Sequence, residues 1–437
     1  MKAPAVLVLA ALCAAANDAP VAPVPPMGWN SWDSYGTTVT EAEVKANADF
    51  MAARLSSHGW QYIVIDIQWS DPQAKAHGYR PNAELTIDPY GRLTPAVNRF
   101  PSAAEGKGFR PLADYIHAKG LKFGIHIMRG IPRRAVAANL PVFASKAHAG
   151  NIADSLSICG WNSDMYGVDL HKPGAQDYYD SIVRLYADWG VDYIKADDIA
   201  RPLHAEEIEA LHKAIVKSGR PIVLSLSPGP ADLTKADFYA ANANLWRVSG
   251  DLWDRWQDVR RTFDLMDKWS KYSKPGGWPD ADMLPLGHIG IRAERGNDRM
   301  SLLTHDEQQT LMTLWSIARS PLMVGGDLPT SDAFTLSLLT SDEVLAVNQY
   351  GANSHQLVAL GDQIVWESHG PRGEQYFALF NTGESAAPGQ INLKLPSLTG
   401  AGPRDLWSGQ QITAPADGRI MVPPHGARLI AFQSPRN

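Results

Sequence analysis

The feature that most limits the possible folds is an alternation of short apolar segments with helical ones, up to about residue 340. Eight segments have β-type composition, at residues 27–32, 62–66, 121–127, 191–197, 222–227, 245–250, 276–278 and 321–325. Helical patterns lie between most of them. Nearly continuous apolar strands that alternate with helices are typical of a parallel sheet, because each parallel crossover needs a connecting helix. Eight such strands predict a closed (β/α)8 barrel.

The first helical pattern shows how such a segment begins and ends. Thr40 and Glu43 form a capping-box sequence, and Gly59 predicts the end of the helix. Residues 112–119 and 178–189 have similar helical patterns. One apolar face of the first helix contains Val44, Ala48, Met51 and Leu55.

The sequence changes character after about residue 340. Helical periodicity is lost, and short strand candidates are separated by turns rich in Gly, Pro, Asp and Ser. The predicted fold is therefore of the α/β class, a (β/α)8 TIM barrel at 20–345 followed by a C-terminal antiparallel β-sandwich domain at 346–437. The strand candidates of this second domain are residues 356–360, 363–368, 375–381, 390–393, 404–407 and 428–432.

Composition excludes several classes of protein. The 437 residues suit one barrel of about 250 residues or more with a smaller companion domain. With 45% hydrophobic and 20% charged residues, the chain has enough apolar side chains for a large core and is not a disordered protein. A net charge of −6 and the lack of any Lys/Arg run argue against nucleic acid as a partner.

The first 19 residues have the pattern of a signal peptide. Lys2 precedes an apolar run at 5–12 and small residues at 14–16. The run is too short to anchor the chain in a bilayer. We expect a cleaved leader at 1–19 and a secreted or periplasmic protein. Removal of Cys13 would leave Cys159 as a lone thiol, without an intrachain disulfide.

Polar residues end the fourth predicted strand, which reads VDYIKADD. Active sites of such barrels form at the carboxyl ends of the strands. Because strand side chains alternate, Lys195 and Asp197 are expected on one face and Asp198 on the other. A cation beside Asp197 would lower the pKa of that carboxyl and keep it ionised, as a nucleophile requires.

The sixth predicted strand, LWRVSGD, supplies a second carboxylate in the same way. Arg247, Ser249 and Asp251 share one face by the same alternation. Asp251 is therefore a candidate general acid/base, with Arg247 as a donor to sugar hydroxyls. Two inward carboxylates on separate strands are what a retaining glycosidase needs, although ordinary salt bridges at the barrel rim would produce the same spacing.

The other strand ends also supply polar and aromatic groups. They are Trp29, Asn30, Trp32, Asp66, Trp69, His126, Arg129, Ser225, Ser227, Trp278, Asp280 and Asp282. His117 and His126 lie on different elements without the spacing of metal ligands, so no metal is predicted. No organic cofactor is expected either.

Five motifs in order resemble glycoside hydrolase family 27, the melibiase-type α-galactosidases. The first is PPMGWNSWDSYG at residues 25–36. It is followed by YADWGVDYIKAD, WRVSGD, GGWPDADML and LWSIARSPLMVGGDL. The resemblance implies Asp197 as nucleophile and Asp251 as acid/base, with no metal or cofactor. It also implies a substrate-binding set of Trp29, Asp66, His126, Lys195, Ser227 and Arg247.

Three positions depart from the pattern of typical α-galactosidases. Asp66 is followed by Ile67, where those enzymes carry a second acid. The resemblance implies that this acid would be a partner for axial and primary sugar hydroxyls. His126 replaces the usual Tyr. Ser227 stands where a Glu would contact the 2-hydroxyl, as a Ser does in related α-N-acetylgalactosaminidases. The resemblance therefore predicts the reaction type more firmly than the sugar.

The leading interpretation is a retaining exo-α-glycosidase, an α-galactosidase that forms a glycosyl-Asp197 intermediate on an oligosaccharide or polysaccharide. Related specificities remain alternatives with the same mechanism: α-N-acetylgalactosaminidase, β-L-arabinopyranosidase or an isomaltodextranase-like activity. An inactive carbohydrate-binding barrel is an alternative of another class. The C-terminal domain is expected to stabilise the barrel, with polysaccharide binding as its alternative role.

Overall fold

The computed structural model of the chain describes residues 20–80, 82–390, 403–412 and 419–432. Eight parallel strands form one curled sheet in the order β10-β9-β8-β7-β3-β2-β1-β13. Each overlaps one of the eight segments predicted from the sequence, so the predicted barrel is confirmed. The strands are β1 (Met27–Asn30), β2 (Tyr62–Ile65), β3 (Lys122–Met128), β7 (Tyr193–Asp197), β8 (Val223–Leu226), β9 (Leu245–Arg247), β10 (Trp278–Asp280) and β13 (Leu322–Val324).

The two end strands of this sheet are joined through the segment that follows β10. The Leu284 N–H donates to the Met323 carbonyl at 2.7 Å, and the Gly325 N–H donates to the Leu284 carbonyl at 3.0 Å. This closes the ring without direct pairing of β10 with β13. The strand predicted at 276–278 begins two residues later, at Trp278, because Lys274 and Gly277 pair with each other in a turn.

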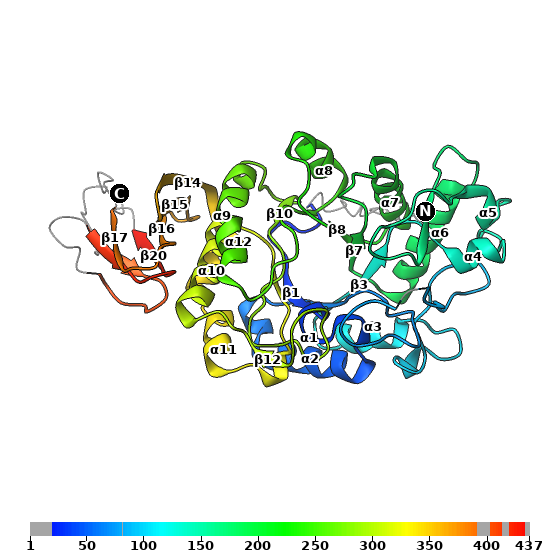
Figure 1. Ribbon diagram of the computed structural model, residues 1–437, viewed down its shortest axis with the longest axis horizontal. Helices are drawn as coiled ribbons and strands as arrows, with labels where there is room; N and C mark the ends of the chain where they lie inside the picture. The colour runs from blue at the N-terminus through cyan, green and yellow to red at the C-terminus, as the bar shows by residue number, and fades with distance from the viewer. Residues whose placement is uncertain (1–19, 81, 391–402, 413–418, 433–437) are drawn as a thin grey trace, which may run out of the picture.

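Helices surround the barrel on the outside of the sheet (Figure 1). At the start of α2 the Glu43 N–H donates to the Thr40 hydroxyl and the Thr40 N–H donates to the Glu43 carboxylate, as the capping box predicted. The helix ends at Arg54 rather than at Gly59, because a 3₁₀ turn takes over before Gly59 adopts a φ of 96°. The outer helices are α2 (Glu41–Arg54), α3 (Arg110–His117), α6 (Ala175–Trp189), α7 (Ala205–Ser218), α8 (Ala236–Asn242), α9 (Trp256–Ser270), α10 (His305–Ala318), α11 (Ala333–Leu339) and α12 (Asp342–Tyr350).

A small excursion between β3 and α6 was not predicted. It contains two short helices and a three-stranded antiparallel sheet, whose strands are too short to give a periodic sequence signal. Because this excursion begins at the carboxyl end of β3, it extends the wall of the barrel at its mouth. Its elements are β4 (Ile131–Pro132), α4 (Arg133–Ala137), α5 (Ala149–Ile152), β5 (Ala153–Asp154) and β6 (Met165–Val168).

The C-terminal domain is an antiparallel β structure packed beside α9 and α10 (Figure 1). Phe380 meets Phe263 of α9 edge-on at 4.9 Å, and His425 contacts Glu307 of α10 at 2.8 Å. Its main sheet has the order β14-β15-β16-β20-β18, and β17 pairs with β19. The strands are β14 (Ala352–Leu360), β15 (Gln363–His369), β16 (Gln375–Asn381), β17 (Ala387–Gln390), β18 (Arg404–Asp405), β19 (Arg419–Val422) and β20 (Ala427–Phe432).

Two sequence predictions fall outside the described residues. The expected signal peptide at 1–19 is one, and residues 391–393 of an expected strand are the other. Within the described part of the chain, no helix is both long and apolar enough to cross a membrane.

Candidate active site

A buried ion pair links the ends of β2 and β7. The Lys195 ammonium donates to Asp66 Oδ2 at 2.8 Å, and the Asn30 amide donates to the same oxygen at 2.8 Å. Burial opposes the charge on Asp66, but the charges of Lys195 and His126 outweigh it and hold the pKa of Asp66 well below its usual range. Burial likewise opposes the Lys195 charge, yet Asp66 and Asp197 raise the pKa of Lys195. Both groups of the pair are therefore ionised.

Asp197 is the last residue of β7, and both of its carboxylate oxygens have partners. The Asp198 N–H donates to Oδ1 at 2.9 Å, and His126 Nε2 lies 3.1 Å from Oδ2. Burial favours the neutral acid, but the His126 hydrogen bond and the charges of His126 and Lys195 lower the pKa of Asp197. The site thus holds an ionised carboxylate without a direct ion pair to Lys195.

Asp198 belongs to a different network, as the alternation of strand side chains predicted. Its carboxylate accepts from the Arg129 guanidinium at 2.8 Å, and Arg129 also pairs with Glu207 at 2.8 Å. These groups are buried between β3, β7 and α7. Asp198 therefore stabilises the strand ends and does not face Lys195 or Asp66.

Arg247 holds the second predicted carboxylate. Its guanidinium donates to Asp251 Oδ1 at 3.1 Å and pairs with Asp282 Oδ1 at 2.7 Å. The predicted strand 245–250 ends early, at Arg247, so Asp251 lies on the following loop. The Asp251 side chain is 42% exposed, against 12% for Asp197. Asp251 can therefore exchange protons with solvent, whereas Asp197 is enclosed.

Two further carboxyl groups beside Asp251 had no predicted role. Burial, followed by the charges of Asp282 and Asp251, raises the pKa of Asp33 well above its ordinary value. One oxygen of Asp33, Oδ2, is buried without a hydrogen-bond partner among the described residues. Burial also raises the pKa of Asp282, with Asp251 and Asp280 adding to it against Arg247. Asp33 lies inside the WNSWD motif, and this motif is the sequence signal that could have identified Asp33 as a site residue.

Two predicted sugar-binding residues, Trp29 and Ser227, are buried and hydrogen-bonded to backbone groups of the barrel. Trp29 is 0% exposed, and its indole N–H donates to the Gly326 carbonyl at 2.9 Å, so its ring belongs to the barrel core. Ser227 follows β8 and is buried, with its carbonyl accepting from the backbone of residues 199 and 200. The structure thus brings together Asp66, His126, Lys195, Asp197, Arg247 and Asp251.

Aromatic rings that sequence reasoning left without a role line the mouth of the barrel. Trp32, just after β1, stacks on Tyr79 with ring centroids 5.7 Å apart. Burial, and then the charges of Glu294, Asp197, Asp66 and Asp251, raise the pKa of the Tyr79 phenol. The charges of both predicted catalytic carboxylates therefore act on this phenol. Tyr79 sits in a long loop without periodicity, so the sequence offered no signal for it.

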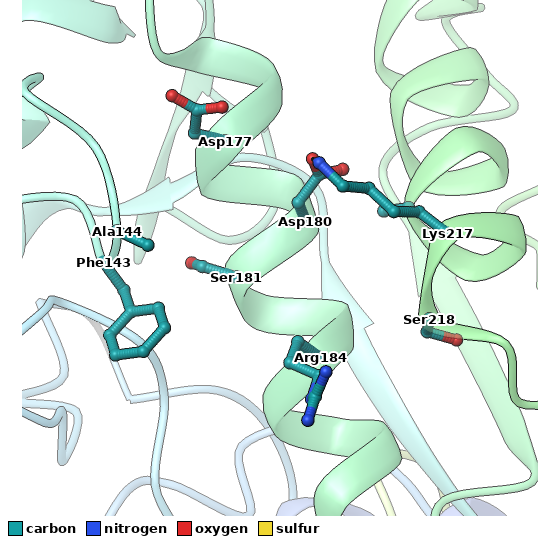
Figure 2. A pocket seen from close by; sticks show the side chains of 9 residues that line it. Phe143, Ala144, Asp177, Asp180, Ser181, Arg184, Lys217 and Ser218 are labelled. Carbon is teal, nitrogen blue, oxygen red and sulfur yellow. Dashed lines mark hydrogen bonds and ion pairs between the residues drawn. The ribbon is translucent and has the colours of Figure 1, made fainter.

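A different cavity, of about 250 Å³, lies on the outer helices (Figure 2). It is formed by α6, α7 and the segment at 143–144, and Asp180 pairs with Lys217 there at 2.5 Å. None of the predicted site residues lines it. Among the described residues, no group of three or more His, Cys, Asp or Glu side chains is placed to hold a metal ion.

Comparison with known proteins identifies the family. The α-galactosidase A model matches residues 24–169 and 169–350, and the α-galactosidase C-terminal β-sandwich model matches residues 360–432. α-Galactosidase 2 of Arabidopsis thaliana is 30% identical over 405 residues, covering 90% of this chain and 85% of the relative.

Two solved structures are more similar than that relative. A family 27 β-L-arabinopyranosidase from Geobacillus stearothermophilus has a TM-score of 0.88 and 52% identity, covering 94% of this chain and 96% of that one. A Bacillus halodurans protein, named as a candidate α-N-acetylgalactosaminidase, has a TM-score of 0.84 and 45% identity, covering 96% and 100%. The chain therefore belongs to glycoside hydrolase family 27, the melibiase-type α-galactosidase family, and is a glycoside hydrolase with a carbohydrate substrate.

Proposed function

We propose that this enzyme is a retaining exo-glycosidase that hydrolyses terminal β-L-arabinopyranosides. The observation that carries the choice of sugar is Ile67, a buried apolar side chain directly after Asp66. The resemblance to α-galactosidases implies a second acid at this place, as partner of axial and primary sugar hydroxyls. β-L-Arabinopyranose has the ring stereochemistry of α-D-galactose but lacks the hydroxymethyl group, and so needs no partner for a primary hydroxyl.

The first half of the proposed reaction uses the two carboxylates in opposite protonation states. Ionised Asp197 attacks the anomeric carbon as the bond to the leaving oxygen breaks, and Asp251 gives its proton to that oxygen. The lowered pKa of Asp197 supports the nucleophilic role. The product of this half is a glycosyl ester on Asp197 and a free alcohol.

The second half reverses the role of Asp251. Its carboxylate takes a proton from water, the water oxygen attacks the anomeric carbon, and the ester bond to Asp197 breaks. Two inversions at one carbon return the original configuration. The greater exposure of Asp251 suits this role, because water must reach it in every cycle.

In the proposed mechanism, the two cations of the site hold the sugar and stabilise the developing charge. Lys195 forms an ion pair with Asp66, and Arg247 forms one with Asp251. Charge-assisted hydrogen bonds from such groups to sugar hydroxyls are stronger than neutral ones. The four groups would fix the ring while its anomeric carbon moves between the two carboxylates.

The size of the sugar preference follows from the chemistry of Ile67. An apolar pocket rejects a ligand that adds a hydroxyl by only about 10²-fold, less than a polar site rejects a ligand that lacks one. We therefore expect residual activity on α-galactosides. The β-L-arabinopyranosidase at 52% identity supports the proposal. The Arabidopsis thaliana relative supports α-galactosidase as the second candidate, which was the leading interpretation of the sequence.

A panel of nitrophenyl glycosides tests the proposal. We expect kcat/KM on the β-L-arabinopyranoside to exceed that on the α-D-galactoside by about 10-fold to 100-fold. A dominant α-galactoside would favour the second candidate, and a dominant α-N-acetylgalactosaminide would assign the specificity to Ser227. Sugar binding without any turnover would show an inactive carbohydrate-binding barrel.

Ile67→Asp is expected to shift the preference toward the α-galactoside by about tenfold or more, because the new carboxylate can accept from the primary hydroxyl. The measurement is the ratio of kcat/KM for the two nitrophenyl glycosides. Ile67→Val is the matched control, since it shortens the side chain without adding a polar group. An equal shift in both variants would mean that space, and not hydrogen bonding, sets the preference.

His126→Phe is expected to move the acid limb of kcat/KM to higher pH. In the wild type, His126 helps to hold the pKa of Asp197 below its ordinary value of 3.8, so the nucleophile stays ionised in mild acid. Without that hydrogen bond, burial raises the pKa, and activity falls at about pH 5 relative to pH 7. A pH profile of kcat/KM checks this. His171→Phe, at a side chain that is 80% exposed, should leave the profile unchanged, and an unshifted limb in His126→Phe would contradict the assignment.

The same proposal extends to location. The signal-peptide pattern at 1–19 supports export, and an extracellular or periplasmic enzyme would meet its glycoside outside the cytoplasm. N-terminal sequencing of the protein from the culture medium and the periplasm tests this. A mature chain that still begins at Met1 inside the cell would contradict it.

A further inference from the structure

A cleft of about 560 Å³ opens at the mouth of the barrel, beside the proposed active site. Its walls are residues 77–80, 159–163 and 294–295. Residues 77–80 lie in the loop after β2, residues 159–163 between β5 and β6 of the excursion that follows β3, and residues 294–295 in the segment that follows β10. All three segments stand in connections that begin at the carboxyl ends of barrel strands, so the cleft lies on the same edge as Asp197 and Asp251.

A continuous series of contacts connects this cleft with the sugar-binding residues. The Asn30 side chain donates to Asp66 and accepts from the backbone N–H of Trp32 at 2.9 Å. The Trp32 ring stacks on Tyr79, with an interplanar angle of 23°. Tyr79 in turn packs against Trp161, with ring centroids 5.3 Å apart. The rings thus lead outward from the place of the bound sugar toward solvent.

The outermost ring is available to a ligand. Trp161 is 40% exposed and stands in the wall of the cleft. Polar groups surround it, including Asn162 and Glu294. A flat apolar face edged by hydrogen-bonding groups matches a sugar ring, which has apolar C–H faces and hydroxyls around its edge.

We propose that this cleft is the subsite for the leaving group and that it binds a sugar residue of an oligosaccharide, stacked on Trp161. The inference rests on the proposed function, because the leaving oxygen must lie between Asp251 and the cleft. The stacking of Tyr79 on Trp32, and the hydrogen bonds from Trp32 through Asn30 to Asp66, support this placement. The natural substrate is then a chain that carries the hydrolysed sugar as its terminal unit, rather than a glycoside of a small alcohol.

Trp161→Ala tests the proposal with two substrates that share one glycone. The first is a disaccharide, whose second sugar reaches the cleft. The second is the glycosyl fluoride, whose single-atom leaving group does not reach it. We expect kcat/KM for the disaccharide to fall about tenfold, the size of one lost ring contact, and that for the fluoride to change by less than about twofold.

Two control variants and the choice of glycone keep the result interpretable. Trp161→Tyr should restore most of the disaccharide activity, because it returns an aromatic face. Phe143→Ala removes an aromatic side chain of similar exposure from the cavity of Figure 2 and should affect neither substrate. The comparison uses whichever glycone the wild-type enzyme hydrolyses, so an incorrect choice of arabinose would leave this test intact.

Two outcomes would overturn the proposal. Equal losses on the disaccharide and the fluoride would mean that Trp161 supports the active site and does not bind the leaving group. No loss on either would mean that the cleft is not used. Light scattering adds a separate readout, since the connection from β5 to β6 that contains Trp161 also contains Leu156, which is 92% exposed. Dissociation of an oligomer together with equal losses would assign this face to contacts between copies of the chain.

Discussion

Asp197→Asn is expected to lower kcat by at least about 10⁴-fold on every substrate, because the amide cannot form the glycosyl ester. Asparagine keeps the shape of the side chain and can still contact His126, which lies 3.1 Å from the carboxylate. The fold should therefore remain intact. The measurements are steady-state kinetics with an activated nitrophenyl glycoside, and circular dichroism with thermal unfolding for structure.

The neighbouring carboxylate provides a matched control for this variant. Asp198 is adjacent in sequence but pairs with Arg129 on the opposite face of β7. Asp198→Asn should lower the free energy of unfolding by weakening a buried ion pair, with a much smaller effect on kcat. Near-wild-type activity in Asp197→Asn, or equal loss of kcat in the two variants, would remove the nucleophilic role from Asp197.

Asp251→Ala is expected to give a loss that depends on the leaving group. With a poor leaving group kcat/KM should fall about 10²-fold to 10⁴-fold, the usual contribution of a general acid. With a dinitrophenyl leaving group, which needs no proton, the first half of the reaction should remain fast. The second half should then limit turnover, because nothing activates the water. Initial-rate kinetics with a series of substituted phenyl glycosides measures this dependence.

Azide distinguishes a lost acid/base from a damaged site. Azide attacks the glycosyl-enzyme without a general base, so it should raise the turnover of Asp251→Ala and give a glycosyl azide of retained configuration. Asp254→Ala is the control, since Asp254 pairs with Arg299 at 2.6 Å and is expected to matter for stability alone. A uniform loss on all leaving groups, without azide rescue, would contradict the role of Asp251.

The sequence predicted the barrel because strands and helices have distinct hydrophobic periods, and eight repeats of that alternation leave few other folds. The side-chain alternation of a strand applies to Lys195 and Asp197, which both belong to β7. Asp198 has a different partner, Arg129, as predicted, but it lies just beyond the strand with a φ of 56°. The same argument was less secure for Asp251, because β9 ends at Arg247. Asp251 still contacts Arg247, but through the geometry of a loop.

Residues on long loops could not be predicted. Tyr79, Trp161 and Glu294 come from three loops that are far apart in sequence, and only the closed barrel brings them together. Trp29 is a case in which the sequence position alone was misleading. It lies at a strand end, as a sugar-binding ring would, yet its side chain is wholly buried and its indole N–H donates to the Gly326 carbonyl. The sequence predicts which residues lie at a strand end. Whether such a side chain faces the active site or the core depends on its packing against neighbouring strands, which the sequence does not show.

The most direct test is to locate the glycosyl group on the enzyme during turnover. Asp251→Ala would be mixed with a dinitrophenyl glycoside of the preferred sugar, quenched in acid, digested and examined by mass spectrometry. We expect the peptide that contains Asp197 to gain the mass of one anhydro sugar, with fragmentation placing that mass on the Asp197 carboxylate. A label on a different carboxylate, or product formation without any label and with inverted configuration, would contradict a double displacement through Asp197.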